Sequence, residues 1–166
     1  MVTNEMVATR SEIAVENGLV TGGHALECEA GIAMLKAGGN AIDAVVAAAF
    51  VGFVVEPSSC GIGGYGRLAL FLADRKKFVT VDHYVRAPAA ARGDMYRIDP
   101  AKPWKYYGFP HTEGSQAEIG HRAVAVPGAI TGLCMTLERF GSLKLAQVLE
   151  PAIAAAEAGQ IGRAHV

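Results

Sequence analysis

The chain has 166 residues, of which 51% are hydrophobic, and a formal net charge of −1. This length and apolar content suit a folded domain and exclude an intrinsically disordered chain. The small net charge argues against nucleic acid or an anionic membrane surface as a partner. The longest uncharged apolar run, Ala44 to Val55, is shorter than the roughly 20 residues that cross a bilayer, so no membrane span is expected.

The cysteines and the first residues bear on location. Cys28, Cys60 and Cys134 are an odd number without a CxxC pair, which disfavours a disulfide framework or a zinc site and is typical of a reducing compartment. The start of the chain has no signal-peptide pattern, so a cytoplasmic location is expected. A periplasmic or extracellular location stays open if the true start lies upstream of Met1.

Two helices are predicted in the first third of the chain. Apolar spacing predicts one from Ala25 that ends at the pair Gly38-Gly39, because glycine adopts the left-handed backbone that stops a helix. The second is predicted from Ala41 to the residues before Pro57, and its uncharged run must be buried nearly all round. Asn40 is a good N-cap, and the residue three positions on can complete a capping box.

The remaining elements complete a fold of the α/β (α+β) class. Residues 58–66 form a glycine-rich loop, and two β-prone segments, 67–73 and 77–83, are predicted to pair as a hairpin. An irregular stretch then leads to a helix from Ala129 to Phe140. A last helix is predicted over 143–158, with Pro151 expected to kink or split it.

The glycine-rich loop also fits a dinucleotide-binding pattern. Gly61, Gly63 and Gly66 match G-x-G-x-x-G, and Asp82 lies at about the distance of a ribose-binding acid. That fingerprint has to follow a strand and open a helix, whereas here a helix precedes the loop and a strand follows it. The order of elements therefore disfavours a dinucleotide site.

The same loop contains a candidate thiol nucleophile. Cys60 could act as a thiolate with His83 as its base, but no residue of the pattern orients that base or lowers the pKa of the thiol. A buried, unreactive cysteine is the favoured interpretation. The histidines show no metal-ligand spacing, so no metal site is predicted.

Arg86 is a candidate clamp for a substrate carboxylate. It stands between a β-prone segment and the turn that Ala87-Pro88 begins, where a guanidinium can make two parallel hydrogen bonds to a carboxylate. A structural salt bridge with Asp82 or Asp94 is the alternative, and spacing alone favours it.

Several motifs, in this order along the chain, resemble the gamma-glutamyltranspeptidase family, and the resemblance runs from about residue 17 to 159. They are EAG at 29–31, LKAGGNAIDAVVA at 35–47, EP at 56–57, GIGGYG at 61–66, RAPAAA at 86–91, DMY at 94–96, VPGAITG at 126–132, FGSL at 140–143, EPAI at 150–153 and AEAG at 156–159. The GGNAIDA segment joined to the glycine loop is the most specific of these.

The resemblance implies an N-terminal-nucleophile hydrolase with an αββα sandwich. In that family the precursor cuts itself into a large and a small subunit. The threonine at the new N-terminus attacks the amide of a gamma-glutamyl donor such as glutathione, and its own amine serves as base. The acceptor is water, an amino acid or a peptide. No metal or organic cofactor and no nucleic-acid or membrane partner is implied.

Residues 1–160 resemble only the N-terminal part of the large-subunit domain. The resemblance therefore implies that the catalytic threonine is absent from this chain, which by itself is predicted to be inactive. The remainder of the large subunit and the small subunit are its expected partners. A divergent, acylase-like amide hydrolase of the same family, or a catalytically inert truncated fragment, stays open as an alternative.

One departure from the family bears on specificity. The family's arginine for the substrate carboxylate stands three residues before the Ala-Pro pair, and Tyr84 occupies that position here. Arg86 lies two residues further on, which on a strand is the same face about 7 Å along. Arg86 is therefore the candidate replacement, and gamma-glutamyl specificity is the property that the change affects. Tyr65 within the glycine run and Arg67 after it also depart from the family pattern.

The last residues, 161–166, are interpreted separately from the domain. In one reading frame the start of a common sequencing-library adapter encodes the same hexapeptide, IGRAHV. This segment is therefore expected to be a non-native read-through tail. An ordinary polar terminus is the alternative.

The 166 residues expressed alone are expected to be poorly soluble or molten, because the resemblance implies that most of one central sheet lies outside them. Near-UV circular dichroism during a thermal scan checks this. A sharp, cooperative transition would contradict it.

Overall fold

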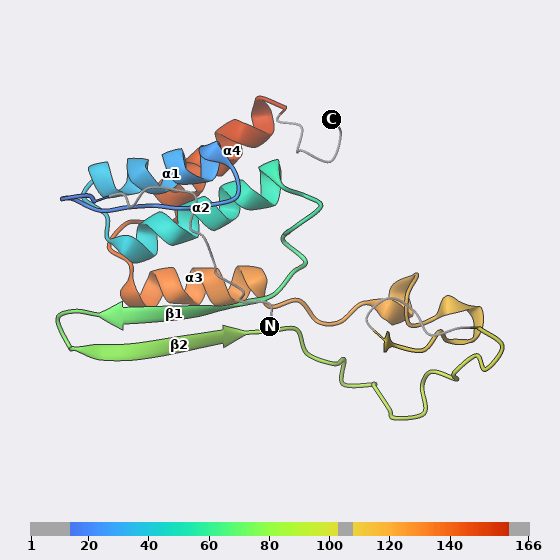
Figure 1. The fold of residues 1–166 in the computed structure, drawn as a ribbon. Coiled ribbons are helices and arrows are strands. Elements are labelled where there is room, and N and C mark those ends of the chain that lie inside the picture. Colours follow the sequence, from blue (N-terminus) through green and yellow to red (C-terminus); the bar gives the residue numbers. More distant parts are fainter. Residues whose placement is uncertain (1–13, 103–107, 160–166) are drawn as a thin grey trace, which may run out of the picture.

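The computed structural model describes residues 14–102 and 108–159. Its elements follow in the order α1 (Ala25–Lys36), α2 (Ala41–Val55), β1 (Gly66–Leu72), β2 (Lys77–His83), η2 (Glu113–Ser115), η3 (His121–Ala123), α3 (Ala129–Phe140) and α4 (Leu145–Glu157). Helices α1 and α4 pack on α2, and α3 lies between α2 and the β1–β2 hairpin (Figure 1). The segment between β2 and α3 forms a lobe that projects from one end of the hairpin (Figure 1). The predicted tail, 161–166, lies outside the described residues.

The corner between α1 and α2 has the geometry that its glycines predict. Gly38 has a φ of +86°, in the left-handed region that favours glycine. Its N–H donates to Leu35 O at 3.1 Å, and the N–H of Gly39 donates to Met34 O at 2.9 Å. These two bonds satisfy carbonyls that the end of α1 leaves free, as in a Schellman motif.

Helix α2 begins with the predicted capping box. The Asn40 side-chain oxygen accepts hydrogen bonds from the N–H groups of Ile42 and Asp43, at 2.8 and 3.2 Å. In return, the Asp43 carboxylate accepts from the Asn40 N–H at 2.7 Å. The start of this helix is therefore set by local sequence.

The core forms around α2, which is buried on nearly every side, as its uncharged sequence predicts. Val46, Ala47 and Val55 have no exposed surface. The buried cluster draws on α1, α2, α3, α4 and β1, with the members Ala30, Met34, Ile42, Ala44, Val46, Ala47, Phe50, Val51, Val55, Leu70, Leu133, Leu137, Val148 and Ala152. Within the described ranges, no helix combines the length and the apolar character that crossing a membrane requires.

The predicted hairpin is present, one residue earlier in its first strand than expected. Strands β1 and β2 pair antiparallel in a register that runs from Gly66 opposite His83 to Leu72 opposite Lys77. Side chains alternate, so that the face toward the helices is half-buried or buried and the opposite face is exposed. On the exposed face, Phe71 and Phe78 pack ring to ring at 4.9 Å while remaining 55% and 79% exposed.

Helix α4 corrects one expectation. Pro151 does not split it, since α4 is one helix from Leu145 to Glu157 with the proline inside. Proline removes one backbone hydrogen bond of the helix. The buried side chains of Val148 and Ala152 on either side of it anchor α4 to the core, and this packing holds the helix together across that position.

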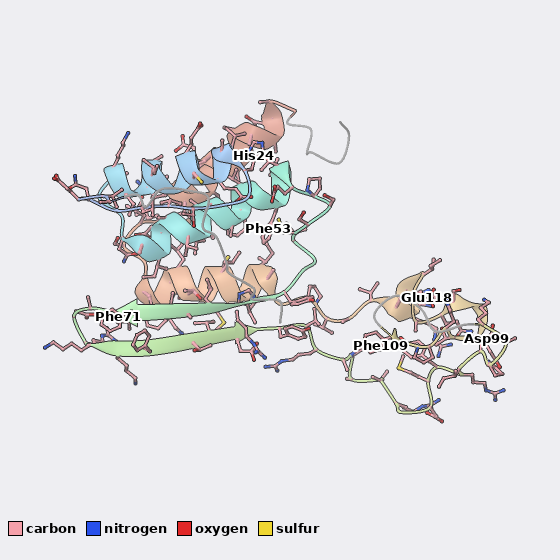
Figure 2. The ribbon with its side chains drawn as sticks, in the orientation of Figure 1. His24, Phe53, Phe71, Asp99, Phe109 and Glu118 are labelled. Atoms are coloured by element: carbon pink, nitrogen blue, oxygen red, sulfur yellow. The ribbon has the colours of Figure 1, made fainter. Side chains whose placement is uncertain are left out.

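The lobe between β2 and α3 is irregular, as predicted for this stretch. Among its described residues, isolated bridges pair Arg86 with Val126 and Ile98 with Thr112, and His111 Nδ1 lies 2.8 Å from a Glu118 carboxylate oxygen. Asp99, Phe109 and Glu118 lie together in the lobe, whereas Phe71 lies at the far end of the hairpin (Figure 2). The lobe is thus held by polar contacts of its own, apart from the helical core.

The Asp43 carboxylate also joins α2 to the corner between α3 and α4. It is fully buried and accepts from Ser142 N at 3.0 Å, Ser142 Oγ at 2.6 Å and Leu143 N at 3.0 Å. A side chain at Gly141 would place its Cβ 2.7 Å from Asp43 Oδ1, so only glycine fits there. The same carboxylate thus caps one helix and holds the turn between two others.

Burial by itself raises the pKa of Asp43, but the hydrogen bonds from Ser142, Leu143 and Asn40 outweigh it and hold that pKa below its ordinary value. A carboxyl whose pKa is lowered by folding stabilises the native state above the pKa that it has in the unfolded chain. That contribution is lost as the pH falls below about 3.9 and through the lowered native value.

Replacing Asp43 with Asn is expected to destabilise the protein by about 2–3 kcal/mol near neutral pH, because an amide presents an N–H donor to groups that are themselves donors. Urea unfolding of the protein expressed from its complete coding sequence measures this. The difference from wild type should shrink as the pH falls below about 3.9 and through the lowered pKa of the native carboxylate.

The control for that variant is Asp74→Asn, which changes an exposed carboxylate in the hairpin turn. It should leave stability within about 0.5 kcal/mol of wild type. Equal effects of the two substitutions would show that the buried carboxylate has no special role.

Candidate substrate-binding site

The glycine-rich loop is fastened to the start of α3. Gly64 O accepts hydrogen bonds from Gly128 N at 3.2 Å and Ala129 N at 3.1 Å. No side chain caps α3, so this carbonyl satisfies donors that the helix start would leave free. The loop contributes a carbonyl here, and it ties β1 to the helix that forms one wall of the site.

Close backbone packing brings β2 against α3. A Cβ on Gly132 would lie 2.2 Å from His83 Cβ, and a Cβ on Gly128 would lie 2.3 Å from His83 O. On the other side of the imidazole, a Cβ on Gly66 would lie 2.8 Å from its Cε1. Glycine is therefore required at Gly128 and Gly132 for β2 and α3 to approach so closely, and Gly66 on β1 leaves room for the tip of the imidazole ring.

A cavity of about 350 Å³ lies where the end of β2 meets α3. Its lining is formed by β2 and its continuation, by the segment before α3 and by one face of α3. The residues are Val81, Asp82, His83, Tyr84, Arg86, Val126, Pro127, Gly128, Thr131, Gly132 and Met135. Both sequence-predicted site residues, Tyr84 and Arg86, lie on this cavity.

Arg86 has a fixed backbone and an unpaired side chain. Its N–H donates to Val126 O at 3.1 Å, and the Val126 N–H donates back to Arg86 O at 2.9 Å. Within residues 14–102 and 108–159 its exposed guanidinium has no ion-pair or hydrogen-bond partner. The alternative partners are engaged elsewhere, Asp82 with Arg67 at 3.5 Å and Asp94 with Arg92 at 3.2 Å. The predicted salt bridges of Arg86 are therefore not formed, and its role as a clamp stays a prediction.

Tyr84 is held by its neighbours on the exposed face of the hairpin. Its ring lies 4.2 Å from the Tyr65 ring, and the Arg67 guanidinium lies 5.8 Å from the Tyr84 ring centre. The Tyr84 N–H donates to Asp82 Oδ1 at 3.1 Å. A hydrogen bond with Tyr84 raises the pKa of the Tyr65 hydroxyl, and the charge on Tyr84 and burial add to this. The Tyr65 hydroxyl is therefore neutral near pH 7.

Sequence reasoning missed the place of Arg67. The sequence marks Arg67 only as a departure from the family pattern. Its position beside Tyr84 depends on the strand register, which sets Arg67 opposite Asp82. Because Asp82 and Tyr84 are two residues apart, they share a face. Assigning a register to the predicted hairpin would have placed Arg67 beside Tyr84 from the sequence.

Neither alternative chemistry finds support in the geometry. Burial raises the pKa of the Cys60 thiol, and the nearby Glu27 and Glu56 carboxylates raise it further, so the thiol stays protonated. Cys60 Sγ lies 3.6 Å from Glu56 O, whereas His83 packs on glycines of β1 and α3. The glycine loop lies between α2 and β1, the reverse of the dinucleotide order. In the part of the chain that the structure describes, no three histidine, cysteine or acidic side chains gather as metal ligands.

Comparison with known proteins identifies the family. Residues 28–162 match the family model described as gamma-glutamyltranspeptidase. The chain belongs to the gamma-glutamyltranspeptidase family. Its described residues hold part of the N-terminal-nucleophile hydrolase fold, with mixed helix and strand.

Members of this family with different activities are among the relatives. The chain is 44% identical over 142 residues to an acylase ACY 1 proenzyme of Pseudomonas sp. (strain V22), which covers 86% of this chain and 25% of that protein. It is 33% identical over 156 residues to a glutathione hydrolase proenzyme of Pseudomonas sp. (strain A14), covering 94% and 25%. The chain thus spans about a quarter of the length of these curated relatives.

A solved structure supports the same assignment. The crystal structure of Helicobacter pylori gamma-glutamyltranspeptidase superposes with a TM-score of 0.76 at 34% identity, covering 90% of this chain and 40% of that one. The fold and family therefore agree with the resemblance read from the motifs.

Replacing Gly132 with Ala is expected to destabilise the protein by about 1–3 kcal/mol, because the new methyl group would collide with His83. An exposed glycine in the middle of a helix would instead gain about 0.5–1 kcal/mol from the same change. Urea unfolding of the complete protein measures whether Gly132→Ala lowers or raises the free energy of unfolding.

The double variant Gly132→Ala with His83→Gly is the control. Removing the whole side chain of His83, including the Cβ that the new methyl group would meet, should relieve the collision, so that the two substitutions are non-additive by about 1–3 kcal/mol. Strict additivity, or a stabilising Gly132→Ala, would mean that the packing between β2 and α3 does not define the cavity.

Proposed function

We propose that the complete protein cleaves an amide bond whose acyl group carries a carboxylate, and that this chain supplies the carboxylate clamp, Arg86. The observation that carries the proposal is the unpaired guanidinium on the rim of the 350 Å³ cavity. Its backbone is fixed by two hydrogen bonds to Val126, so little loop ordering is needed for binding. A planar guanidinium matches a carboxylate with two parallel hydrogen bonds.

The nucleophile is proposed to be the N-terminal threonine of the family, supplied by sequence outside this chain. Its hydroxyl attacks the amide carbonyl and gives its proton to its own amine, and the amide nitrogen leaves as an amine with that proton. Water then attacks the resulting ester and releases the acid. Cys60, whose thiol stays protonated, offers no competing nucleophile.

An acylase-type hydrolase is favoured over classical gamma-glutamyl transfer. Tyr84 replaces the family arginine at the position that binds the substrate carboxylate, and Asp82 neutralises the nearby Arg67. Identity to the acylase, at 44%, also exceeds the 33% identity to the glutathione hydrolase. Gamma-glutamyl donors such as glutathione, with water, an amino acid or a peptide as acceptor, are the second candidate, because a free Arg86 on the same face can still receive their carboxylate.

The remainder of the large subunit and the small subunit are the proposed protein partners. The exposed face of the hairpin supports this, since Phe71 and Phe78 leave apolar surface that nothing in the described residues covers. Large exposed apolar surfaces generally mark an interface.

Gamma-glutamyl anilide and glutaryl anilide, assayed with the complete enzyme, separate the two candidates. They differ only by the α-amino group. An acylase-type enzyme should hydrolyse the glutaryl substrate at least as well, whereas a gamma-glutamyl transferase should strongly prefer the amino acid donor. If the complete enzyme hydrolyses neither anilide, the proposed function is overturned.

Arg86→Ala should raise KM for the preferred anilide by the equivalent of about 2–4 kcal/mol, because it removes a charge-assisted clamp. Arg86→Lys should recover part of the loss, since an ammonium keeps the charge without the planar fork. Arg92→Ala is the matched control, because that guanidinium is exposed and already paired with Asp94. Unchanged kinetics in Arg86→Ala would assign Arg86 to structure.

A further inference from the structure

The Tyr84 ring is unusual among the exposed aromatic side chains of the hairpin, because it both lines the cavity and is held in place. It is 50% exposed, and its partner Tyr65 is 56% exposed. The centres of the Tyr65 and Tyr84 rings lie 4.2 Å apart, and the planes of the two rings make an angle of 54°. The Arg67 guanidinium carbon lies 5.8 Å from the Tyr84 ring centre. The ring is therefore contacted by two side chains from the β1 side, while half of the surface of Tyr84 stays exposed.

Of the two described arginines beside the ring, Arg67 and Arg86, Arg86 is the one whose charge is left for a ligand. Arg67 is paired with Asp82 at 3.5 Å, so that pair is neutral together. Arg86 lies two residues beyond Tyr84, without a partner among the described residues, on the same cavity. Residues two apart on an extended backbone are separated by about 7 Å and face the same way.

A ligand that binds Arg86 through a carboxylate therefore has its body within reach of the Tyr84 ring. A planar ring gains from stacking on a held phenol, whereas a flexible alkyl chain of similar length gains less and must also be ordered. We propose that Tyr84, supported by Tyr65 and Arg67, forms a stacking platform that selects acyl groups with a planar, aromatic body ending in a carboxylate. This rests on the proposed function and names its substrate class.

The test compares two dicarboxylates of equal charge and similar span, terephthalate and adipate, as binding probes for the complete protein. Titration calorimetry should find terephthalate bound roughly 3- to 10-fold more tightly. Tyr84→Ser should remove that preference, and Arg86→Ala should weaken both ligands to a similar degree.

Phe78→Ser is the matched control, because Phe78 is an exposed aromatic residue of the same hairpin that does not line the cavity. It should leave the preference unchanged. A preference that survives Tyr84→Ser, or no preference in wild type, overturns the proposal. Loss of all binding in Tyr84→Ser would also overturn it, since the platform is proposed to select between ligands and Arg86 to hold both.

Hydrolysis of the two mono-anilides is measured separately, as the ratio of kcat/KM values. A ratio that favours the terephthaloyl substrate and falls to near one in Tyr84→Ser supports the platform in catalysis. If the ring preference appears in binding but neither anilide is hydrolysed, the proposed function fails while the platform stands as a binding site. If both anilides are hydrolysed at equal rates, the platform fails and the proposed function stands.

Discussion

The buried carboxylate of Asp43 is the interaction on which the arrangement of the helices depends. It accepts hydrogen bonds from the N–H that begins α2 and from the backbone and hydroxyl groups of the turn between α3 and α4. A buried anion is costly unless its lone pairs are satisfied. Here the cost is met by the donors that two helix boundaries would otherwise leave unpaired.

Helix α3 connects this interaction to the cavity, because both of its ends are held by hydrogen bonds. Asp43 binds the turn that follows α3, and the Gly64 carbonyl accepts from the N–H groups at its start. Between these ends, Gly132 lets the helix approach β2 so closely that the His83 ring fills the gap. The cavity follows directly from this contact, since it lies between the continuation of β2 and the exposed side of the same helix.

The chemistry of the site lies on the opposite face of the strand from the core. Alternation along β2 sends His83 toward α3 and leaves Asp82, and beyond the strand Tyr84, on the exposed side. Exposed side chains are free to vary without loss of packing, which is how a family can keep its fold while changing the groups that meet a substrate. Tyr84, which stands where the resemblance implies an arginine and has the Arg67 guanidinium beside its ring, is proposed to be such a change.

The sequence alone determined the local elements and the family. The features that it predicts depend on residues close together in the chain, so they can be recognised without a structure. They are the Gly38-Gly39 corner, the Asn40–Asp43 capping box, the uncharged run of α2 and the two hairpin segments. The sequence also singled out Arg86 and Tyr84. It allowed Pro151 to split the last helix, which stays one helix because buried side chains on both sides of the proline hold it.

Only the tertiary structure decided which residues meet across long stretches of chain. Asp43 reaches Ser142, His83 rests on Gly132, and Asp82 pairs with Arg67 and not with Arg86. Each of these contacts depends on the strand register and on the approach of whole elements, and no local pattern encodes either. Among the residues that the structure describes, the fold thereby leaves the Arg86 guanidinium without a partner at the cavity, because its two acidic candidates, Asp82 and Asp94, are paired with other arginines.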